Sequence, residues 1–221
     1  MRETRPMPPA ASVAHKGTGE RLHAPAAERN AQAIARVLQD YAPQKGTALE
    51  IASGTGQHVA AFAELLPGLT WQPSDIAADR LASINSWAED KPGILPAIRL
   101  DATRPGWSRD HGGKAVILLV NLLHLISTAE ARTVVCEAAA ALAPSGRFFL
   151  YGPFLRDGQA ISDGDARFDA ALRSSDPAIG YKDIVEVRQW LADAGLTEVA
   201  LLDMPANNLT MISARPEETF E

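Results

Sequence analysis

Residues 48–58 read Ala48-Leu49-Glu50-Ile51-Ala52-Ser53-Gly54-Thr55-Gly56-Gln57-His58, and the rest of the chain is organised around them. An apolar run ends in the acid Glu50, two glycines follow, and an amphipathic helix pattern then begins. This order predicts a strand, a tight turn and a helix, the unit with which α/β proteins hold nucleotide-like ligands. Gly54 and Gly56 can take a positive φ and carry no Cβ, so a ligand can lie against the backbone there.

The spacing of the acid and the glycines separates two kinds of α/β protein. A dinucleotide fold needs G-x-G-x-x-G, but Val59 stands where the third glycine should be. With Glu50 four residues before Gly54, the stretch instead resembles the acid-x-G-x-G-x-G pattern of Rossmann-like methyltransferases that use S-adenosylmethionine (SAM). Ala52 takes the first glycine position of that pattern, a small departure that is tolerable if its φ stays negative.

Length and composition are those of an ordinary α/β protein. The 221 residues fit one domain, 22% of them are charged and 46% are hydrophobic. The net charge of −6 argues against non-specific binding of nucleic acid, which needs a basic surface. No apolar run approaches the ~20 residues of a membrane helix, so we expect no membrane partner.

The ends of the chain and its one cysteine allow three further expectations. Residues 1–19 are rich in proline and alanine and predict a flexible tail, residues 20–215 a single domain, and residues 216–221 a second tail. Cys136 permits no internal disulfide, which favours a reducing, cytoplasmic location. We expect Cys136 to be a small buried side chain on a helix.

Strand and helix patterns alternate along the chain, which predicts an α/β fold with a mostly parallel sheet. The expected strands after the first are 69–73, 97–100, 115–121, 147–151, 199–204 and 209–214, and the expected helices include 24–41, 76–88, 127–142, 165–172 and 183–195. The last two strands predict a terminal antiparallel hairpin. The resemblance implies a Rossmann-like methyltransferase fold of seven strands with helices on both faces. Residues 155–182 form the longest irregular connection and predict a lid or substrate loop.

Polar residues end four consecutive strand candidates: Glu50, Asp75, Asp101 and Asn121. In open α/β sheets such ends converge on the ligand crevice. Asp75 can accept hydrogen bonds from both ribose hydroxyls, and Asp101 from the adenine amino group. Each residue taken singly is equally well explained as a helix cap or turn former. The full predicted cofactor-binding set is Glu50, Ala52, Ser53, Gly54, Thr55, Gly56, His58, Asp75, Ile76, Asp101, Ala102, Asn121 and Leu122.

Further motifs resemble one family of unassigned function, the methyltransferase-like protein 26 family. The resemblance covers about residues 22–215 and rests on these stretches: Ala24-Pro25-Ala26-Ala27-Glu28-Arg29-Asn30, the glycine turn through His58, Trp71-Gln72-Pro73-Ser74-Asp75, Asn121-Leu122-Leu123-His124, Gly152-Pro153-Phe154, Phe168-Asp169 and the run from Asp176-Pro177 to Asp183. It implies a fold and a SAM site but no substrate.

Residues for chemistry are less well marked than residues for the cofactor. His124, three residues past Asn121, is the best candidate for a general base, and Tyr151 is a second candidate. Packing explains either one as well. Arg29, Asn30 and Tyr181 are candidate substrate-lining residues. No His/Cys cluster has metal-ligand spacing, so we expect no metal.

Three functions of different classes remain open from the sequence. The first is a SAM-dependent methyltransferase that acts on an unidentified, small-molecule acceptor and releases S-adenosylhomocysteine (SAH). The second is a SAM- or SAH-binding module without turnover. The third, a NAD-dependent oxidoreductase, is disfavoured by Val59 and by the acid at Glu50.

Overall fold

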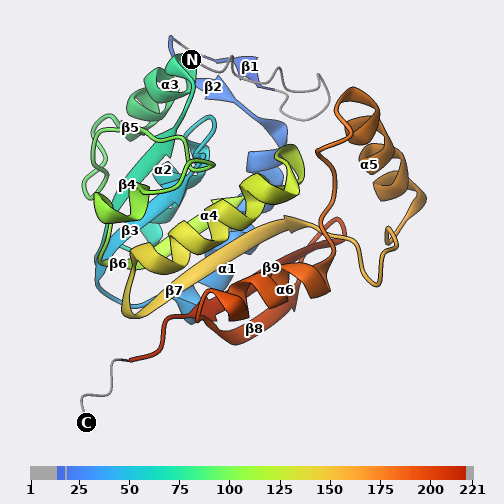
Figure 1. Ribbon diagram of the computed structural model, residues 1–221. Helices are drawn as coiled ribbons and strands as arrows, with labels where there is room; N and C mark the ends of the chain where they lie inside the picture. Colours follow the sequence, from blue (N-terminus) through green and yellow to red (C-terminus); the bar gives the residue numbers. More distant parts are fainter. Residues whose placement is uncertain (1–13, 18, 218–221) are drawn as a thin grey trace.

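Seven strands form the central sheet of the computed structural model, which describes residues 14–17 and 19–217 (Figure 1). The strands are β3 (Gly46–Ile51), β4 (Leu69–Asp75), β5 (Ile98–Arg99), β6 (Lys114–Val120), β7 (Leu142–Pro153), β8 (Thr197–Asp203) and β9 (Asn208–Ala214). Their order across the sheet is β5-β4-β3-β6-β7-β9-β8. Only β9 runs antiparallel to its neighbours. The mostly parallel sheet with a terminal hairpin is therefore confirmed.

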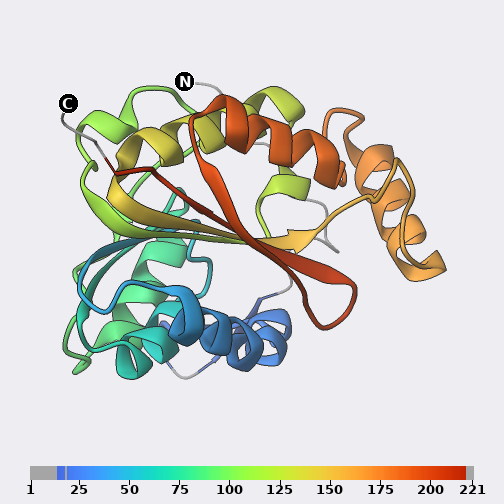
Figure 2. The ribbon, with the colours of Figure 1, turned by 90° about the horizontal axis from the view of Figure 1, so that it is seen from below.

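Helices cover both faces of this sheet, as Figure 2 shows with the sheet seen nearly edge-on. The helices are α1 (Pro25–Tyr41), α2 (Gln57–Leu65), α3 (Ala78–Ala88), α4 (Thr128–Ala141), α5 (Asp163–Ser175) and α6 (Ile184–Asp193), with short 3-10 turns η1 (Trp107–Arg109) and η2 (Leu123–Leu125). Helices α1, α2 and α3 pack on one face, and α4 and α6 on the other. Helix α5 stands at the side of the molecule, beyond the end of β7 (Figures 1 and 2).

The core follows from the apolar patterns of the strands. Residues 116–119 of β6 are fully buried and contribute alternately to the two helix-covered faces, as expected of a central parallel strand. Ser127 and Glu130 form a capping box at the start of α4, a pattern that the sequence also carries. Asp183 caps α6, and Gly195, at φ 79°, follows its end.

Strand β7 begins five residues earlier than the sequence predicts. The expected turn at residues 144–146 lies inside the strand as an irregularity, because Leu142 pairs with Lys114 and Arg147 pairs with Val116. Ser145 accommodates the extra residues at φ 61°. A turn signal in sequence thus marks a bulge here and not a strand boundary.

One strand of a short two-stranded sheet lies in the expected N-terminal tail, and the other lies at the start of the expected domain. β1 (His15–Lys16) pairs antiparallel with β2 (Leu22–His23). The second strand is fastened to α3, where the indole of Trp87 donates to the carbonyl of Leu22. Residues 1–13, 18 and 218–221, which include most of both expected tails, lie outside the described residues.

Two expectations drawn from composition can be compared with the structure. Cys136 is exposed on α4, so the prediction that it is buried is wrong. The alanine-rich helix turns this position toward solvent, between the buried positions Val135 and Ala138. In the described part of the chain, no helix is both long and apolar enough to cross a membrane.

Candidate functional site

The carboxyl ends of β4, β3 and β6 lie side by side at one edge of the sheet. The chain moves outward from β3 to β4 and β5 on one side, and from β6 to β7 on the other, so the strand order reverses between β3 and β6. Ligands of open α/β sheets bind outside such a reversal point. Glu50, Asp75 and Asn121 come from the ends of these three strands, as the sequence predicts, and Asp101 follows β5.

Glu50 is buried with only 1% of its surface exposed, and its Oε2 atom has no hydrogen-bond partner among the described residues. Burial, with a smaller contribution from the carboxylate of Asp75, raises the pKa of Glu50 to about 8. A buried polar oxygen without a partner costs free energy. A donor or cation brought to the end of β3 would satisfy this oxygen.

The two glycines of the turn have different roles. A Cβ at Gly54, which has φ 60°, would meet nothing within 4 Å. A Cβ at Gly56, which has φ 90°, would lie 2.7 Å from the Cα of Ile84 in α3. Gly56 therefore allows close packing of the turn against α3, whereas Gly54 leaves open space beside the backbone, where a ligand could lie.

Ala52 adopts φ 54°, so the condition under which an alanine is easily tolerated at this position is not met. The first position of the motif, where the resemblance places a glycine, requires the left-handed conformation here. An L-residue with a Cβ pays ~1–2 kcal/mol to adopt it. Asn121, at the end of β6, also has a positive φ, of 57°.

Asp75 fastens the glycine turn to the end of β4. Its Oδ2 accepts from the N–H of Gly54 at 3.0 Å, and its Oδ1 accepts from the N–H groups of Ile76 at 2.7 Å and Ala77 at 3.1 Å. Burial raises its pKa, and these three donors oppose that rise. A carboxylate has about four acceptor sites, so Asp75 has room for about one more donor. The sequence predicts that Asp75 accepts hydrogen bonds from two ribose hydroxyls, and the remaining capacity of its carboxylate allows about one.

Ser53 and Thr55 fix the glycine turn through hydrogen bonds to β4 and α3. The N–H of Ser53 donates to the carbonyl of Ser74 at 2.8 Å, and the N–H of Ser74 donates to the hydroxyl of Ser53 at 3.1 Å. The carbonyl of Thr55 accepts from the hydroxyl of Ser83 in α3 at 2.7 Å. Both residues are buried, so their side chains shape the turn.

Gln57 is a residue of the turn that sequence reasoning missed. Its Oε1 accepts from the N–H of Ala24 at 2.6 Å and from the hydroxyl of Thr55 at 2.8 Å. It therefore ties the segment before α1 to the glycine turn. The available signal is a polar side chain placed directly after Gly56.

Asp101 forms the turn after β5. Its Oδ1 accepts from the N–H of Thr103 at 3.1 Å and from its hydroxyl at 2.6 Å, and its Oδ2 accepts from Arg104 at 3.1 Å. The turn-forming role is therefore the one observed, and an adenine contact would be additional. Ala102 is buried and accepts through its carbonyl from the indole of Trp107 at 3.1 Å.

Apolar groups border the crevice on both sides. Ile76 follows Asp75 directly and is 38% exposed, which is high for an isoleucine. Leu122 follows Asn121 and is partly buried against the core. An apolar side chain left exposed beside a ring of polar strand ends is suited to contact a flat ligand.

Three residues with separate predicted roles meet beneath the first turns of α1. The Nε2 atom of His58 lies 2.7 Å from Oδ1 of Asn30, and the hydroxyl of Tyr151 interacts with the Asn30 side chain. All three are buried. Burial lowers the pKa of His58 to about 4 and raises that of Tyr151. This network fixes α1 to α2 and β7, while the neighbouring Arg29 is exposed.

His124 and Tyr181 form an aromatic cluster with Phe168 of α5. The ring centroid of His124 lies 5.9 Å from those of both Phe168 and Tyr181, in edge-to-face contact. Burial, with the charge of Lys182, lowers the pKa of His124 to about 3. Burial, with Asp165 and Asp169, raises the pKa of Tyr181 above its ordinary value. The cluster fastens α5 over η2, next to Asn121.

The residues at the reversal point fit SAM in part. The unpartnered Glu50 oxygen suits its ammonium group, and the open space beside Gly54 suits its close approach. Asp75 offers about one acceptor site for the ribose. Two cavities, of about 260 and 700 Å³, lie elsewhere, one at the β8–β9 hairpin and one between α3 and the segment before β5. Among residues 14–17 and 19–217, no group of three His, Cys, Asp or Glu side chains could hold a metal.

Solved structures with the same fold are O-methyltransferase family proteins. One from Burkholderia thailandensis is 19% identical, with a TM-score of 0.73, over 86% of this chain and 57% of that one. One from Planctomyces limnophilus, in complex with apigenin, is 22% identical, with a TM-score of 0.73, over 86% and 57%. A methyltransferase of calicheamicin biosynthesis in an SAH-bound form is 15% identical, with a TM-score of 0.67, over 85% and 53%. This chain thus spans little more than half their length.

The fold, with its strand order and terminal hairpin, places this protein among the Rossmann-like α/β proteins with the methyltransferase fold. Within that class, the chain belongs to the family described as a protein of unknown function (DUF938), whose family model matches residues 21–215. That match covers all seven strands of the sheet and all six α-helices of the described residues.

Proposed function

We propose that this protein is a SAM-dependent methyltransferase acting on a small-molecule acceptor. The observation that carries the proposal is the pairing of Glu50 and Gly54. An unpartnered carboxyl oxygen lies at the end of β3, and open space lies beside the glycine four residues later. A ligand that combines a cation with a flat nucleoside satisfies the oxygen and occupies the space.

The proposed roles follow from position. Glu50 accepts from the ammonium group, Asp75 accepts from one ribose hydroxyl, and Ile76 packs against the adenine. Asp101 and the N–H of Ala102 contact the adenine edge, and Asn121 and Leu122 border the sulfonium. SAM supplies an electrophilic methyl group, so the chain's main contribution is to hold an acceptor in line with it.

A proton must leave the acceptor only where the attacking atom carries one. His124 is the proposed base. Burial lowers its pKa to about 3, so the ring is neutral at physiological pH but only a weak base while it stays buried, and movement of α5 that exposed it would raise its pKa toward the working range. Tyr151 is less suited, because burial raises its pKa. Tyr181, Asn30 and Arg29 remain proposed substrate contacts, and for the first two movement of α5 or α1 would be needed to expose them.

The same burial favours one alternative, a SAM- or SAH-binding module without turnover. His124 is 5% exposed and Tyr151 is 2% exposed, so neither candidate base faces solvent. Such a module would use the same crevice and the same Glu50. A NAD-dependent oxidoreductase is the less favoured reading, because Val59 occupies the place of the third glycine.

Calorimetric titration with SAM, SAH and NAD tests the cofactor half. We expect binding of SAM and SAH, and loss of about 1.5–3 kcal/mol of SAM affinity in Asp75→Ala, since its hydrogen bonds are charge-assisted. Asp79→Ala, an exposed acid in the first turn of α3, is the matched control and should bind normally. Binding of NAD without SAM would overturn the proposal.

Incubation with methyl-labelled SAM and a metabolite extract tests the catalytic half. Transfer of label to a small molecule supports the enzyme, and tight binding without transfer supports the module. We further propose membership of the methyltransferase-like protein 26 family, on the motifs quoted above, and a cytoplasmic location, on the single cysteine.

A further inference from the structure

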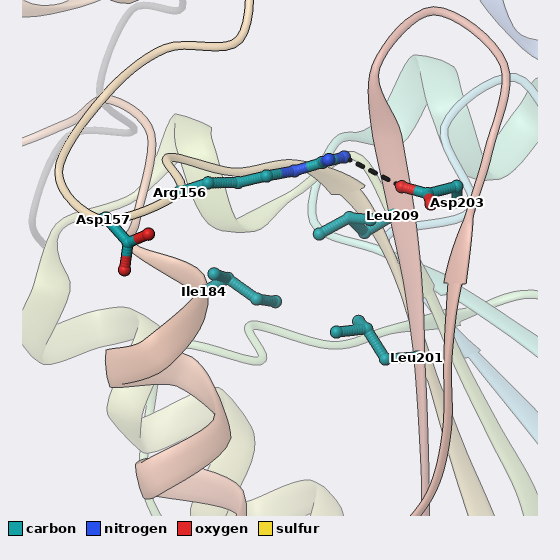
Figure 3. A pocket seen from close by; sticks show the side chains of 6 residues that line it. All are labelled: Arg156, Asp157, Ile184, Leu201, Asp203 and Leu209. Atoms are coloured by element: carbon teal, nitrogen blue, oxygen red, sulfur yellow. Dashed lines mark hydrogen bonds and ion pairs between the residues drawn. The ribbon is translucent and has the colours of Figure 1, made fainter.

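A cavity of about 260 Å³ lies at the carboxyl end of β8, and Figure 3 draws the side chains that line it. Strands β7 and β9 separate it from the reversal point between β3 and β6. It is enclosed by the chain that follows β7, the first residue of α6 and the β8–β9 hairpin. Its lining consists of Arg156, Asp157, Ile184, Leu201, Asp203 and Leu209. The volume lies just under the ~300–1,000 Å³ of pockets for drug-sized ligands, which suits a smaller molecule.

The floor of the cavity is aliphatic. Ile184 and Leu209 are buried, with 8% and 4% of their surfaces exposed, whereas Leu201 on the edge strand is 39% exposed. Figure 3 shows the three side chains below Arg156, in the space between α6 and the hairpin. A branched apolar group placed there would cover Leu201 and remove apolar surface from water.

The rim of the cavity carries a net negative charge. One terminal nitrogen of Arg156 lies 3.1 Å from Oδ1 of Asp203, and this ion pair spans the top of the cavity (Figure 3). Asp157 adds a second carboxylate, so one cation faces two anions and one negative charge remains. Among the described residues, no ion pair is formed by Asp157. The rim therefore favours a cation.

The backbone holds Asp157 in a fixed place. It has φ 53° in a tight turn closed by hydrogen bonds of 2.9 and 3.1 Å between Arg156 and Gln159. The N–H of Gly158 donates to the helix-capping carboxylate of Asp183 at 2.6 Å, which ties the turn to the start of α6. The backbone of Asp157 is therefore fixed at the rim of the cavity, and its side chain is exposed.

Arg156 also carries an unsatisfied hydrogen-bond donor. Its Nε atom is buried and has no hydrogen-bond partner among the described residues, although its terminal nitrogen pairs with Asp203. A buried N–H group without a partner is unfavourable. A ligand oxygen can reach this donor once the Arg156 side chain shifts to expose Nε, which is inaccessible in this structure.

We propose that this cavity binds a small molecule that joins a branched aliphatic group to a protonated amine and a carbonyl oxygen. The aliphatic group lies on Ile184, Leu201 and Leu209, the amine pairs with Asp157, and the carbonyl accepts from Arg156. This site is separate from the strand-end crevice, and its binding can be measured without a methyl donor.

Titration of the full chain with L-leucinamide, followed by NMR chemical shifts, tests the proposal. This probe carries all three groups. We expect saturable binding with shifts at the amides of 156–158 and 201–203. N-acetyl-leucinamide, which lacks the charge, and glycinamide, which lacks the aliphatic group, should each bind at least about tenfold more weakly.

Two variants and a control locate the binding. Asp157→Asn should weaken leucinamide binding about tenfold by removing the charge, and Leu201→Trp should abolish it by filling the floor. Asp110→Asn removes an equal charge on the exposed end of η1 and should bind as the wild type does. Absence of saturable binding to the wild type, or equal affinity for leucinamide and its acetylated form, would overturn the proposal.

Discussion

Replacement of Glu50 by glutamine removes the titration of a carboxyl that burial keeps protonated at neutral pH. In the folded protein the pKa of Glu50 is about 8, against 4.5 for an exposed glutamate. Between these pH values the unfolded chain loses the proton and the folded chain keeps it, so the free energy of unfolding falls as the pH rises. The difference between 8 and 4.5, at ~1.36 kcal/mol per pKa unit, corresponds to about 5 kcal/mol.

Urea unfolding at pH 5 and pH 8 measures this effect. Over that interval the titration of Glu50 should lower the unfolding free energy by several kcal/mol, with ~5 kcal/mol as the upper bound. The buried His58 and His124 act in the opposite direction, because burial lowers their pKa values to about 4 and 3 and the unfolded chain alone loses their protons as the pH rises. Glu50→Gln should keep the histidine contribution and lack the fall, so the difference between the two pH curves isolates Glu50. Glu89→Gln, an exposed acid at the end of α3, should follow the wild type. Parallel curves for Glu50→Gln and the wild type would refute the buried, protonated Glu50.

The same titration reports on the ligand. A cation brought beside Glu50 favours the carboxylate, so SAM binding at pH 7 should release up to one proton. Calorimetry in two buffers of different ionisation enthalpy would detect this release. Glu50→Gln should bind SAM more weakly, and its binding should not release the proton that Glu50 loses in the wild type. If the binding heat of the wild type were the same in both buffers, no proton would be released, and Glu50 would not contact the cation of the ligand.

Three further predictions concern single positions. Gly54→Val should fold and lose SAM binding in a titration, because its side chain enters the open space beside the turn. Gly56→Val should fail to fold, because a Cβ there lies 2.7 Å from a Cα of α3. Normal SAM binding by Gly54→Val would contradict the prediction. Ala52→Gly should raise the unfolding free energy by about 0.5–1 kcal/mol, since it relieves a φ of 54° at some cost in chain entropy; a lower thermal midpoint would count against the strain. His124→Ala should lower turnover and spare SAM affinity, with Phe168→Ala as the control for lost packing; full activity of His124→Ala would end its role as a base.

Local signals in the sequence predicted the parts of the structure that depend on neighbouring residues. The glycine turn, the capping box of Ser127 and Glu130, and the fully buried strand around residues 116–119 each need only a short window. The strand ends that carry Glu50, Asp75 and Asn121 follow from the same windows plus the general rule for open sheets.

Contacts between distant segments could not be predicted in this way. Asn30, His58 and Tyr151 carried three separate expected roles. The fold joins them into one buried network, in which Asn30 contacts residues 28 and 121 positions further along the chain. The expected hydrogen bonds of Asp75 to two ribose hydroxyls also overlooked three backbone donors, because only the folded turn brings Gly54 to that carboxylate.

The strained positions supply an independent reason to place function at this edge. Ala52 and Asn121 each adopt a positive φ directly after β3 and β6, the two strands between which the sheet order reverses. Neither residue is a glycine, and this conformation costs ~1–2 kcal/mol for Ala52 and less for Asn121, because asparagine visits it more readily. Glu50, buried two residues before Ala52 with no partner for Oε2 among the described residues, adds a further cost. Three unfavourable features at adjacent strand ends are difficult to explain by folding alone, since substitution at each could relieve them. They are explained if the backbone bends and the free carboxyl oxygen are what a bound cation and nucleoside require.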